Sequence, residues 1–179
     1  DRISNYTEKE RILIKNPSNT SRIKYLLKEY PHAKFIHIYR NPVFVYLSTY
    51  KFFDELFPSV NLQKFDRDKL IKLVIYNYRE MYEDYYKSKD LIPDNNLIEF
   101  GFEDFRKDPL DHVEKVYKKF ELESFELNKG NFKRYIDSQK SHKVNVYNIK
   151  KELLETIKNE FKQSFDKMKY KVPKNLKIN

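Results

Sequence analysis

The sequence predicts an α/β fold with a partial parallel sheet flanked by helices, and three observations lead to this prediction. Two short apolar runs, residues 11–15 and 34–39, alternate with segments of helical periodicity in a strand, helix, strand, helix order. The second run holds His37 among apolar residues, and such near-continuous apolar character is typical of a strand covered on both faces. A third strand candidate, residues 97–102, follows a long helical segment, as alternating α/β architectures require.

Apolar spacing and helix-start signals predict the helices. Pro17 ends the first strand, Pro42 opens the helix after the second strand, and Asp66 or Asp68 is suited to cap the long third helix. Asn148 is the expected cap of the last helix. The predicted helices cover about residues 20–30, 42–57, 68–89, 109–120 and 148–168, while residues 124–143 form either a short helix or a basic loop.

The 179 residues suit a single domain spanning 1–179, with a lysine-rich tail, 171–179, that we expect to fray. The chain opens on Asp1 rather than Met, so we expect it to be a piece of a longer protein. It has no Cys, which excludes disulfides and cysteine-ligated metals and favours a cytoplasmic location. The four His form no zinc-binding spacing, no run of about 18 apolar residues spans a membrane, and no signal peptide is visible.

The charge balance favours anionic partners. Lys and Arg number 36 against 27 Asp and Glu, which gives a net charge of +9. Nucleic acid is one such partner, because the 15 Tyr and 14 Phe could stack on bases. Most of these aromatics fall on the predicted helix core stripes, however, so we do not expect nucleic acid to be the partner.

Residues 35–48 form the most informative stretch of the chain. A predicted buried strand ends at Arg40, and Pro42 then opens a helix that carries Ser48. A strand-end guanidinium beside a helix amino terminus is a suitable place for a phosphate group. Lys15 ends the preceding predicted strand, and ligands of open α/β sheets bind at the carboxyl ends of the strands. We therefore expect Lys15 and Arg40 to lie at the same edge of the sheet.

The chain contains no Gly-rich phosphate loop. Its only glycines are Gly101 and Gly130, so a complete Walker loop of the type Gly-x-x-x-x-Gly-Lys-Ser/Thr is absent. The sequence therefore excludes an ATP-driven mechanism built from this chain alone.

Several segments resemble the sulfotransferase family, and more narrowly the branch with tyrosylprotein sulfotransferases and many bacterial relatives. The matching segments, in the family's order, are Lys-Asn-Pro-Ser from Lys15, Arg-Asn-Pro from Arg40 with Ser48 eight residues later, Phe-Glu-Asp-Phe from Phe102 with Asp-Pro at 108–109, and Lys-Val-Asn from Lys143. This family transfers a sulfonyl group from 3′-phosphoadenosine 5′-phosphosulfate (PAPS) and leaves 3′-phosphoadenosine 5′-phosphate (PAP). The resemblance implies a P-loop-kinase-like sulfotransferase fold.

The resemblance also implies roles for five residues. Arg40 and Ser48 would bind the 3′-phosphate, and Phe102 would lie near the adenine where the family usually has a Tyr. Lys143 would contact the nucleotide from a loop that closes over it. Lys15 would be the catalytic residue that stabilises charge on the leaving group beside the transferring sulfonyl group.

Two departures from the family pattern indicate a carboxyl-terminal portion of a sulfotransferase. No Pro-Arg-Ser-Gly-Thr-like loop for the 5′-phosphosulfate precedes Arg11, and Pro17 stands where cytosolic members have a base His. The general base is thus unassigned, with His37 expected to be satisfied inside the sheet and His142 in a loop. The acceptor is a hydroxyl- or amine-bearing molecule of unknown kind. The alternatives are a basic nucleic-acid-binding module and a non-catalytic sulfotransferase-like binding module.

Overall fold

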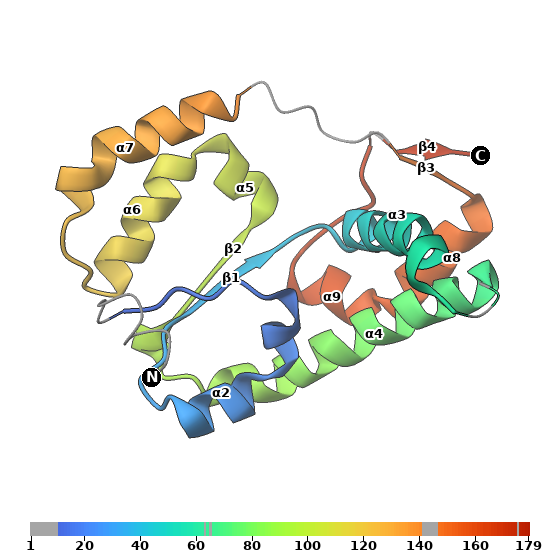
Figure 1. The fold of residues 1–179 in the computed structure, drawn as a ribbon, viewed down its shortest axis with the longest axis horizontal. Helices are drawn as coiled ribbons and strands as arrows, with labels where there is room; N and C mark the ends of the chain where they lie inside the picture. Colours follow the sequence, from blue (N-terminus) through green and yellow to red (C-terminus); the bar gives the residue numbers. More distant parts are fainter. Residues whose placement is uncertain (1–10, 63, 65, 141–146, 175) are drawn as a thin grey trace.

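The computed structural model describes residues 11–62, 64, 66–140, 147–174 and 176–179. Helices dominate the described chain, and the strands are short (Figure 1). In order, the elements are the 3-10 helix η1 (Pro17–Ser21), α2 (Ile23–Glu29), β1 (Phe35–Tyr39), α3 (Pro42–Val60), α4 (Arg67–Ser88), η2 (Lys89–Leu91), η3 (Asp94–Asn96), β2 (Leu97–Gly101), α5 (Phe102–Lys107), α6 (Pro109–Lys119), α7 (Phe125–Ser138), β3 (Asn148–Ile149), α8 (Lys151–Glu160), α9 (Lys162–Lys167) and β4 (Lys177–Ile178).

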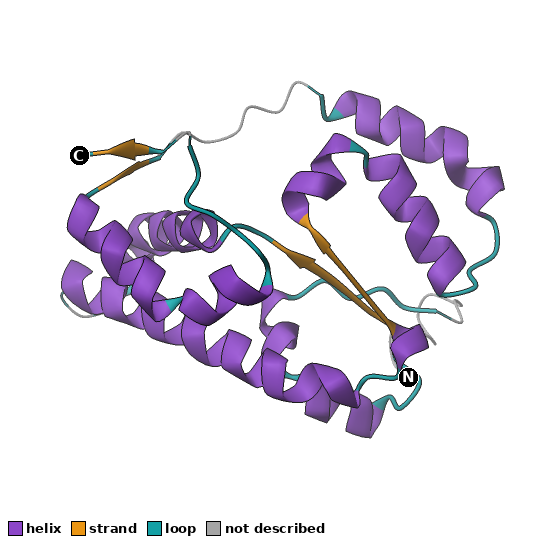
Figure 2. Ribbon diagram, turned by 180° about the vertical axis from the view of Figure 1, so that it is seen from behind, coloured by secondary structure: helices purple, strands orange, loops and turns teal. Residues whose placement is uncertain are grey.

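Strands β1 and β2 pair in parallel and lie between two groups of helices. Helices α5, α6 and α7 gather on one side of the pair, whereas α3, α4, α8 and α9 gather on the other (Figure 2). The register opposes Phe35 to Leu97 and Tyr39 to Gly101. The two strands therefore end side by side, and the next residue of each chain segment, Arg40 or Phe102, leaves the sheet at the same edge. The predicted α/β fold with a parallel sheet is confirmed.

The main core lies between α3, α4 and α8, and α4 supplies the largest share of its buried residues. A stripe of three tyrosines on α4, Tyr78, Tyr82 and Tyr85, is buried, and the ring of Tyr78 packs against Phe161 with a centroid distance of 4.0 Å. The aromatic residues thus fill the interior as the helical spacing predicts. The buried members of this core on the three helices are Val43, Tyr46, Leu47, Leu70, Val74, Ile75, Tyr78, Tyr82, Tyr85, Leu154 and Ile157.

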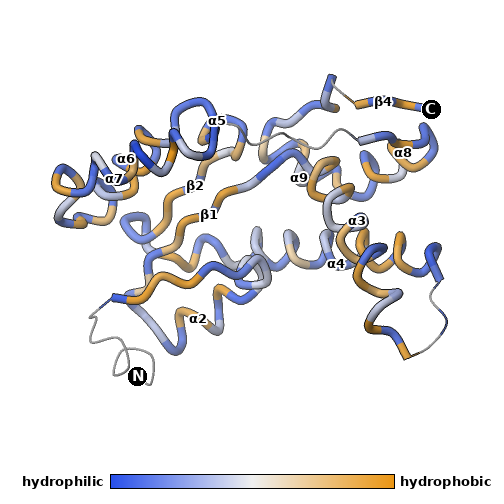
Figure 3. Tube along the Cα trace, turned by 45° about the horizontal axis from the view of Figure 1, so that its top comes forward, coloured by the Kyte–Doolittle hydropathy of each residue, from blue (hydrophilic) through white to orange (hydrophobic). Residues whose placement is uncertain are grey.

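The expected strand at residues 11–15 is wrong. These residues are extended but unpaired in the described part of the chain, and Leu13 is 87% exposed. Apolar composition favours a strand, yet a strand forms only when a neighbour supplies backbone hydrogen bonds. Burial of β1 on both faces is likewise not observed, because Ile36 and Ile38 are 40% and 46% exposed. Figure 3 shows the apolar character of β1, β2 and the segment that follows the N-terminal grey trace.

Several helix boundaries differ from the prediction. Asp66 does cap α4, since its carboxylate accepts hydrogen bonds from the backbone N–H groups of Asp68 and Lys69. Helix α3 continues through Pro58, and the ambiguous region contains the 14-residue helix α7. Asn148 does not cap the last helix, because it pairs in β3, and that helix breaks at Phe161 into α8 and α9.

The tail expected to fray instead makes defined contacts. Strand β4 pairs in parallel with β3 and opposes Lys177 to Asn148 and Ile178 to Ile149. Earlier in the same segment, the carbonyl of Lys171 accepts a hydrogen bond from the side chain of Asn41 at 2.8 Å. The carboxyl-terminal residues are therefore part of the packed structure.

Candidate functional site

Arg40 lies at the junction of β1 and α3, between two aromatic rings. Its guanidinium carbon is 5.5 Å from the ring centroid of Phe44 and 4.9 Å from that of Phe102. Its Nε is buried without a hydrogen-bond partner, and no carboxylate among the described residues forms an ion pair with it. An arginine whose charge is not neutralised by the protein, and whose faces rest on rings, is suited to bind an anion with its remaining N–H groups.

The local sequence fixes the direction in which the chain leaves β1. The side-chain oxygen of Asn41 accepts a hydrogen bond from the N–H of Val43 at 3.1 Å, which caps α3, and Pro42 occupies the first helical position. Asn41 is 5% exposed, so this turn is held inside the protein. Arg40 is thereby presented at the carboxyl edge of the sheet.

Ser48 lies farther along α3 and does not contact Arg40. Its hydroxyl donates to the carbonyl of Val45 at 3.1 Å, a local helix hydrogen bond that leaves the oxygen free to accept one. Phe44 and Ser48 are four residues apart and so share one side of the helix. Phe44 contacts Arg40, and Ser48 lies one turn farther along the same side of α3.

Phe102, the first residue of α5, is brought directly to Arg40 by the parallel register. Lys15 is exposed and makes no contact with Arg40, although its segment runs in the same direction as β1 (Figure 1). Lys143 and His142 lie outside the described residues. The structure therefore joins two of the five predicted site residues, Arg40 and Phe102.

The middle of the sheet holds a second polar cluster, around Glu99 on β2. Its carboxylate accepts hydrogen bonds from Tyr85 Oη at 2.6 Å and Lys89 Nζ at 2.8 Å, and it lies 3.4 Å from His37 Nδ1. These donors, with His37 foremost, lower the pKa of Glu99 to about 2. The prediction that His37 is satisfied inside the sheet holds for Nδ1 but not for Nε2, which is buried without a partner.

This cluster predicts a loss of stability in acid. Because the folded carboxyl group has a lowered pKa, its contribution is complete above about pH 4.5 and disappears as the pH falls towards 2. We expect a contribution of about 1–2 kcal/mol, since the carboxylate is partly exposed and screened by solvent. Urea unfolding of the unmodified protein and Glu99→Gln at several pH values measures it. The difference between the two proteins should shrink below pH 4.5, and a difference independent of pH would contradict this assignment.

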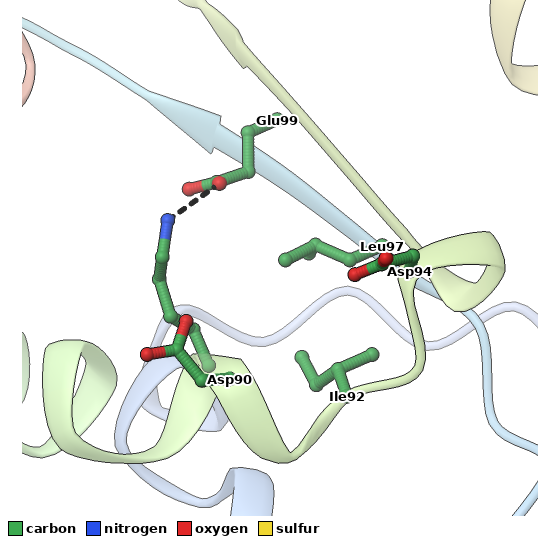
Figure 4. A pocket seen from close by; sticks show the side chains of 6 residues that line it. Asp90, Ile92, Asp94, Leu97 and Glu99 are labelled. Atoms are coloured by element: carbon green, nitrogen blue, oxygen red, sulfur yellow. Dashed lines mark hydrogen bonds and ion pairs between the residues drawn. The ribbon is translucent and has the colours of Figure 1, made fainter.

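A shallow cavity of about 240 Å³ opens beside the same cluster (Figure 4). Its lining contains the carboxylates of Asp90, Asp94 and Glu99 against one cation, Lys89, which pairs with Glu99. It runs along the first half of β2, away from the carboxyl edge where Arg40 lies. A lining with excess negative charge is unsuited to a phosphate-bearing ligand, so this cavity is not the candidate site.

Comparison with known proteins decides the family. A model described as "Sulfotransferase family" matches residues 1–126. The chain belongs to the sulfotransferase family. The matched range contains the motifs that begin at Lys15, Arg40 and Phe102, whereas Lys143 and helices α8 and α9 lie beyond it.

Two curated relatives of this sulfotransferase family member are mycobacterial. Both are named omega-hydroxy-beta-dihydromenaquinone-9 sulfotransferase Stf3, one from Mycobacterium bovis and one from Mycobacterium tuberculosis. Each is 30% identical over 144 residues, a match that covers 80% of this chain and 37% of the relative. The chain thus spans little more than a third of the length of these relatives.

The fold agrees with that of a solved family member. The crystal structure of sulfotransferase STF9 from Mycobacterium avium superposes with a TM-score of 0.76 at 16% sequence identity, covering 92% of this chain and 43% of that one. The α/β architecture seen here is therefore a sulfotransferase fold, and the superposition covers a larger share of the chain than residues 1–126, which the family model matches. Within the described residues, no helix is long and apolar enough to cross a membrane.

Three residues near Arg40 were not identified from the sequence as parts of the site. Phe44 packs on the guanidinium, and its position four residues after Arg40 was a usable signal. Glu103 accepts a hydrogen bond from the N–H of Asn41 at 3.4 Å and another from the hydroxyl of Tyr170. No pattern in the sequence connects Tyr170 to this edge, because the contact joins residues 67 positions apart.

Proposed function

We propose that this chain supplies the 3′-phosphate and adenine half-site of a PAPS-dependent sulfotransferase. The observation that carries the proposal is Arg40, which contacts Phe44 and Phe102 at the carboxyl edge of the sheet and forms no ion pair with any described carboxylate. A forked guanidinium in such a place recognises a phosphate group, and the 3′-phosphate is what distinguishes PAPS and PAP from ordinary adenine nucleotides.

The other site residues take the roles that the family motifs suggest. Ser48 adds a hydroxyl to the 3′-phosphate, Phe102 stacks near the adenine, and Lys143 contacts the nucleotide from its loop. Lys15 stabilises negative charge on the bridging oxygen as it leaves. In the reaction, an acceptor oxygen or nitrogen bonds to sulfur, the bond from sulfur to the bridging 5′-phosphate oxygen breaks, and the acceptor proton passes to a base outside the assigned residues.

The rest of the active site is proposed to lie in chain outside these 179 residues. The chain covers 37% of its curated relatives, and among the described residues β2 is the only strand that pairs with β1. Leu13, Ile36 and Ile38 are exposed there, although parallel strands are normally covered. Further chain of the full-length protein, packed on this face and beside β1, would cover these side chains and bring the residues that bind the 5′-phosphosulfate to the same edge.

The acceptor is proposed to carry a hydroxyl or amine group. The two curated relatives are named for a hydroxylated menaquinone, which is an acceptor of that chemical class. The nucleic-acid alternative has less support, because three tyrosines of α4, Tyr78, Tyr82 and Tyr85, are buried in the core and cannot stack on bases. A non-catalytic sulfotransferase-like module would bind the same nucleotide but would not transfer the sulfonyl group to an acceptor.

Binding of three nucleotides to the full-length protein tests this function. Isothermal titration should give the tightest binding for PAP, weaker binding for adenosine 2′,5′-bisphosphate, which has the same charge in another position, and the weakest for AMP. Equal affinity for the two bisphosphates would mean that only charge is recognised, and would overturn the 3′-phosphate assignment. Sulfonyl transfer to a panel of alcohols and amines then separates an enzyme from a non-catalytic relative.

A further inference from the structure

The chain around Tyr170 crosses the carboxyl ends of β1 and β2. The hydroxyl of Tyr170 donates a hydrogen bond to the carboxylate of Glu103, and its ring meets that of Tyr39 edge to face, with centroids 6.0 Å apart. The next carbonyl, that of Lys171, accepts a hydrogen bond from Asn41 Nδ2 at 2.8 Å. The anchor, defined as Tyr170 and Lys171, thus touches both strand ends.

The contacts that the Tyr170 side chain and the Lys171 carbonyl make with the sheet fall on immediate neighbours of Arg40 or Phe102. Tyr39 and Asn41 flank Arg40, while Glu103 follows Phe102. Glu103 also accepts a hydrogen bond from the N–H of Asn41, so the two strand ends are linked to each other as well as to the anchor. The anchor therefore fixes the backbone next to both Arg40 and Phe102.

Gly101 shows how closely the anchor approaches the sheet. A Cβ atom at this buried position would lie 3.1 Å from the hydroxyl oxygen of Tyr170. The φ angle of Gly101 is −72°, so the backbone conformation itself does not require glycine. The residue is suited to this place because the Tyr170 hydroxyl occupies the space of a side chain.

We propose that Tyr170 and Glu103 are positioning residues that hold Arg40 in register with Phe102 for the 3′-phosphate. The proposal rests on the proposed function and extends the site beyond residues 1–126, which the family model matches. Arg40 has ring contacts but no hydrogen bond of its own within the described structure, so its position depends on the backbone that the anchor fixes. A contact that only stabilised the fold would leave ligand selectivity unchanged.

The variant Tyr170→Phe in the full-length protein tests this role, because it keeps the ring contact with Tyr39 and removes the hydrogen bond to Glu103. We expect the Kd for PAP to rise about 5–10-fold and the Kd for AMP to change less than about twofold. The matched control is Tyr135→Phe on α7, where the side chain is 68% exposed and both affinities should be unchanged. An unchanged ratio of PAP to AMP affinity in Tyr170→Phe overturns the positioning role.

The short distance between Gly101 and the Tyr170 hydroxyl provides a second test, in which a second substitution should restore the binding that the first one weakens. Gly101→Ala places a methyl group against the Tyr170 oxygen and should lower PAP affinity, whereas the double variant Gly101→Ala/Tyr170→Phe has room for the methyl group. We expect the double variant to bind PAP no more weakly than Tyr170→Phe alone. Additive losses overturn the proposal. Failure of the unmodified protein to distinguish PAP from AMP is a separate result, which overturns the proposed function and this extension of it together.

Discussion

Replacing Arg40 with alanine should raise the Kd for PAP about 30–100-fold while changing that for AMP less than about threefold. The loss corresponds to about 2–3 kcal/mol, the range for hydrogen bonds between charged groups. It should be large because the described structure offers no neighbouring cation that is already aimed at the same point. Only PAP carries the 3′-phosphate, so the effect on AMP should be small. Titration of both nucleotides into the full-length protein measures it.

The matched control for this prediction is Arg134→Ala. Arg134 lies on α7, in the group of helices on the other side of the sheet from α3, and its side chain is exposed. Its removal changes net charge by the same amount as Arg40→Ala, so it measures the general electrostatic contribution to nucleotide binding. Equal losses for PAP and AMP in Arg40→Ala, or equal losses in the two variants, would contradict a specific 3′-phosphate contact.

Replacing Phe161 with alanine should destabilise the protein by about 3–5 kcal/mol, the usual cost of truncating a buried aromatic residue. Phe161 is 1% exposed, lies where α8 ends, and its ring packs against that of Tyr78 of α4 with a tilt of 32°. The residue lies beyond the range that the family model matches, so the experiment tests whether the carboxyl-terminal helices belong to the same cooperative unit. Urea unfolding followed by circular dichroism gives the free energy of unfolding.

Phe52→Ala provides the comparison for Phe161→Ala. Phe52 is on α3 and 57% exposed, so the same truncation should cost less than about 1 kcal/mol. A similar loss in both variants would mean that α8 and α9 do not share the main core. Two separate unfolding transitions in the unmodified protein would contradict a single unit.

Local sequence patterns predicted correctly those helices and strands that pack or pair with other segments of the described chain. Strand β1, the cap Asp66 and strand β2 follow from apolar runs and capping chemistry, and each finds its neighbours in the chain. Residues 11–15 have an apolar run like that of β1, but no described strand pairs with them, so they form no strand. Strand formation depends on a partner, and composition alone does not reveal whether one is present.

The candidate site was predictable in its motifs but not in its full set of contacts. Arg40 and Phe102 stood in recognisable segments, and parallel pairing brings the two together. The anchor at Tyr170 was not predictable, since a single tyrosine near the end of a helical segment carries no local signal. Residues 171–179 were expected to fray because they are rich in Lys, yet β4 pairs with β3. The contacts of Tyr170 and the pairing of β3 with β4 thus depend on residues far apart in the sequence, which local patterns do not reveal.

The sequence separation of the anchor's contacts has a consequence for the order of folding. The hydrogen bond from Asn41 to Lys171 joins residues 130 positions apart, and the contact between Asn41 and Glu103 spans 62. Contacts between distant residues form slowly because a long loop must close first. Helices α3 and α4 can form early from local interactions, whereas the contacts that surround Arg40 are completed only after Tyr170 has left the ribosome. During synthesis, nucleotide binding therefore cannot assist the early steps of folding and acts only after the chain through Tyr170 has been made.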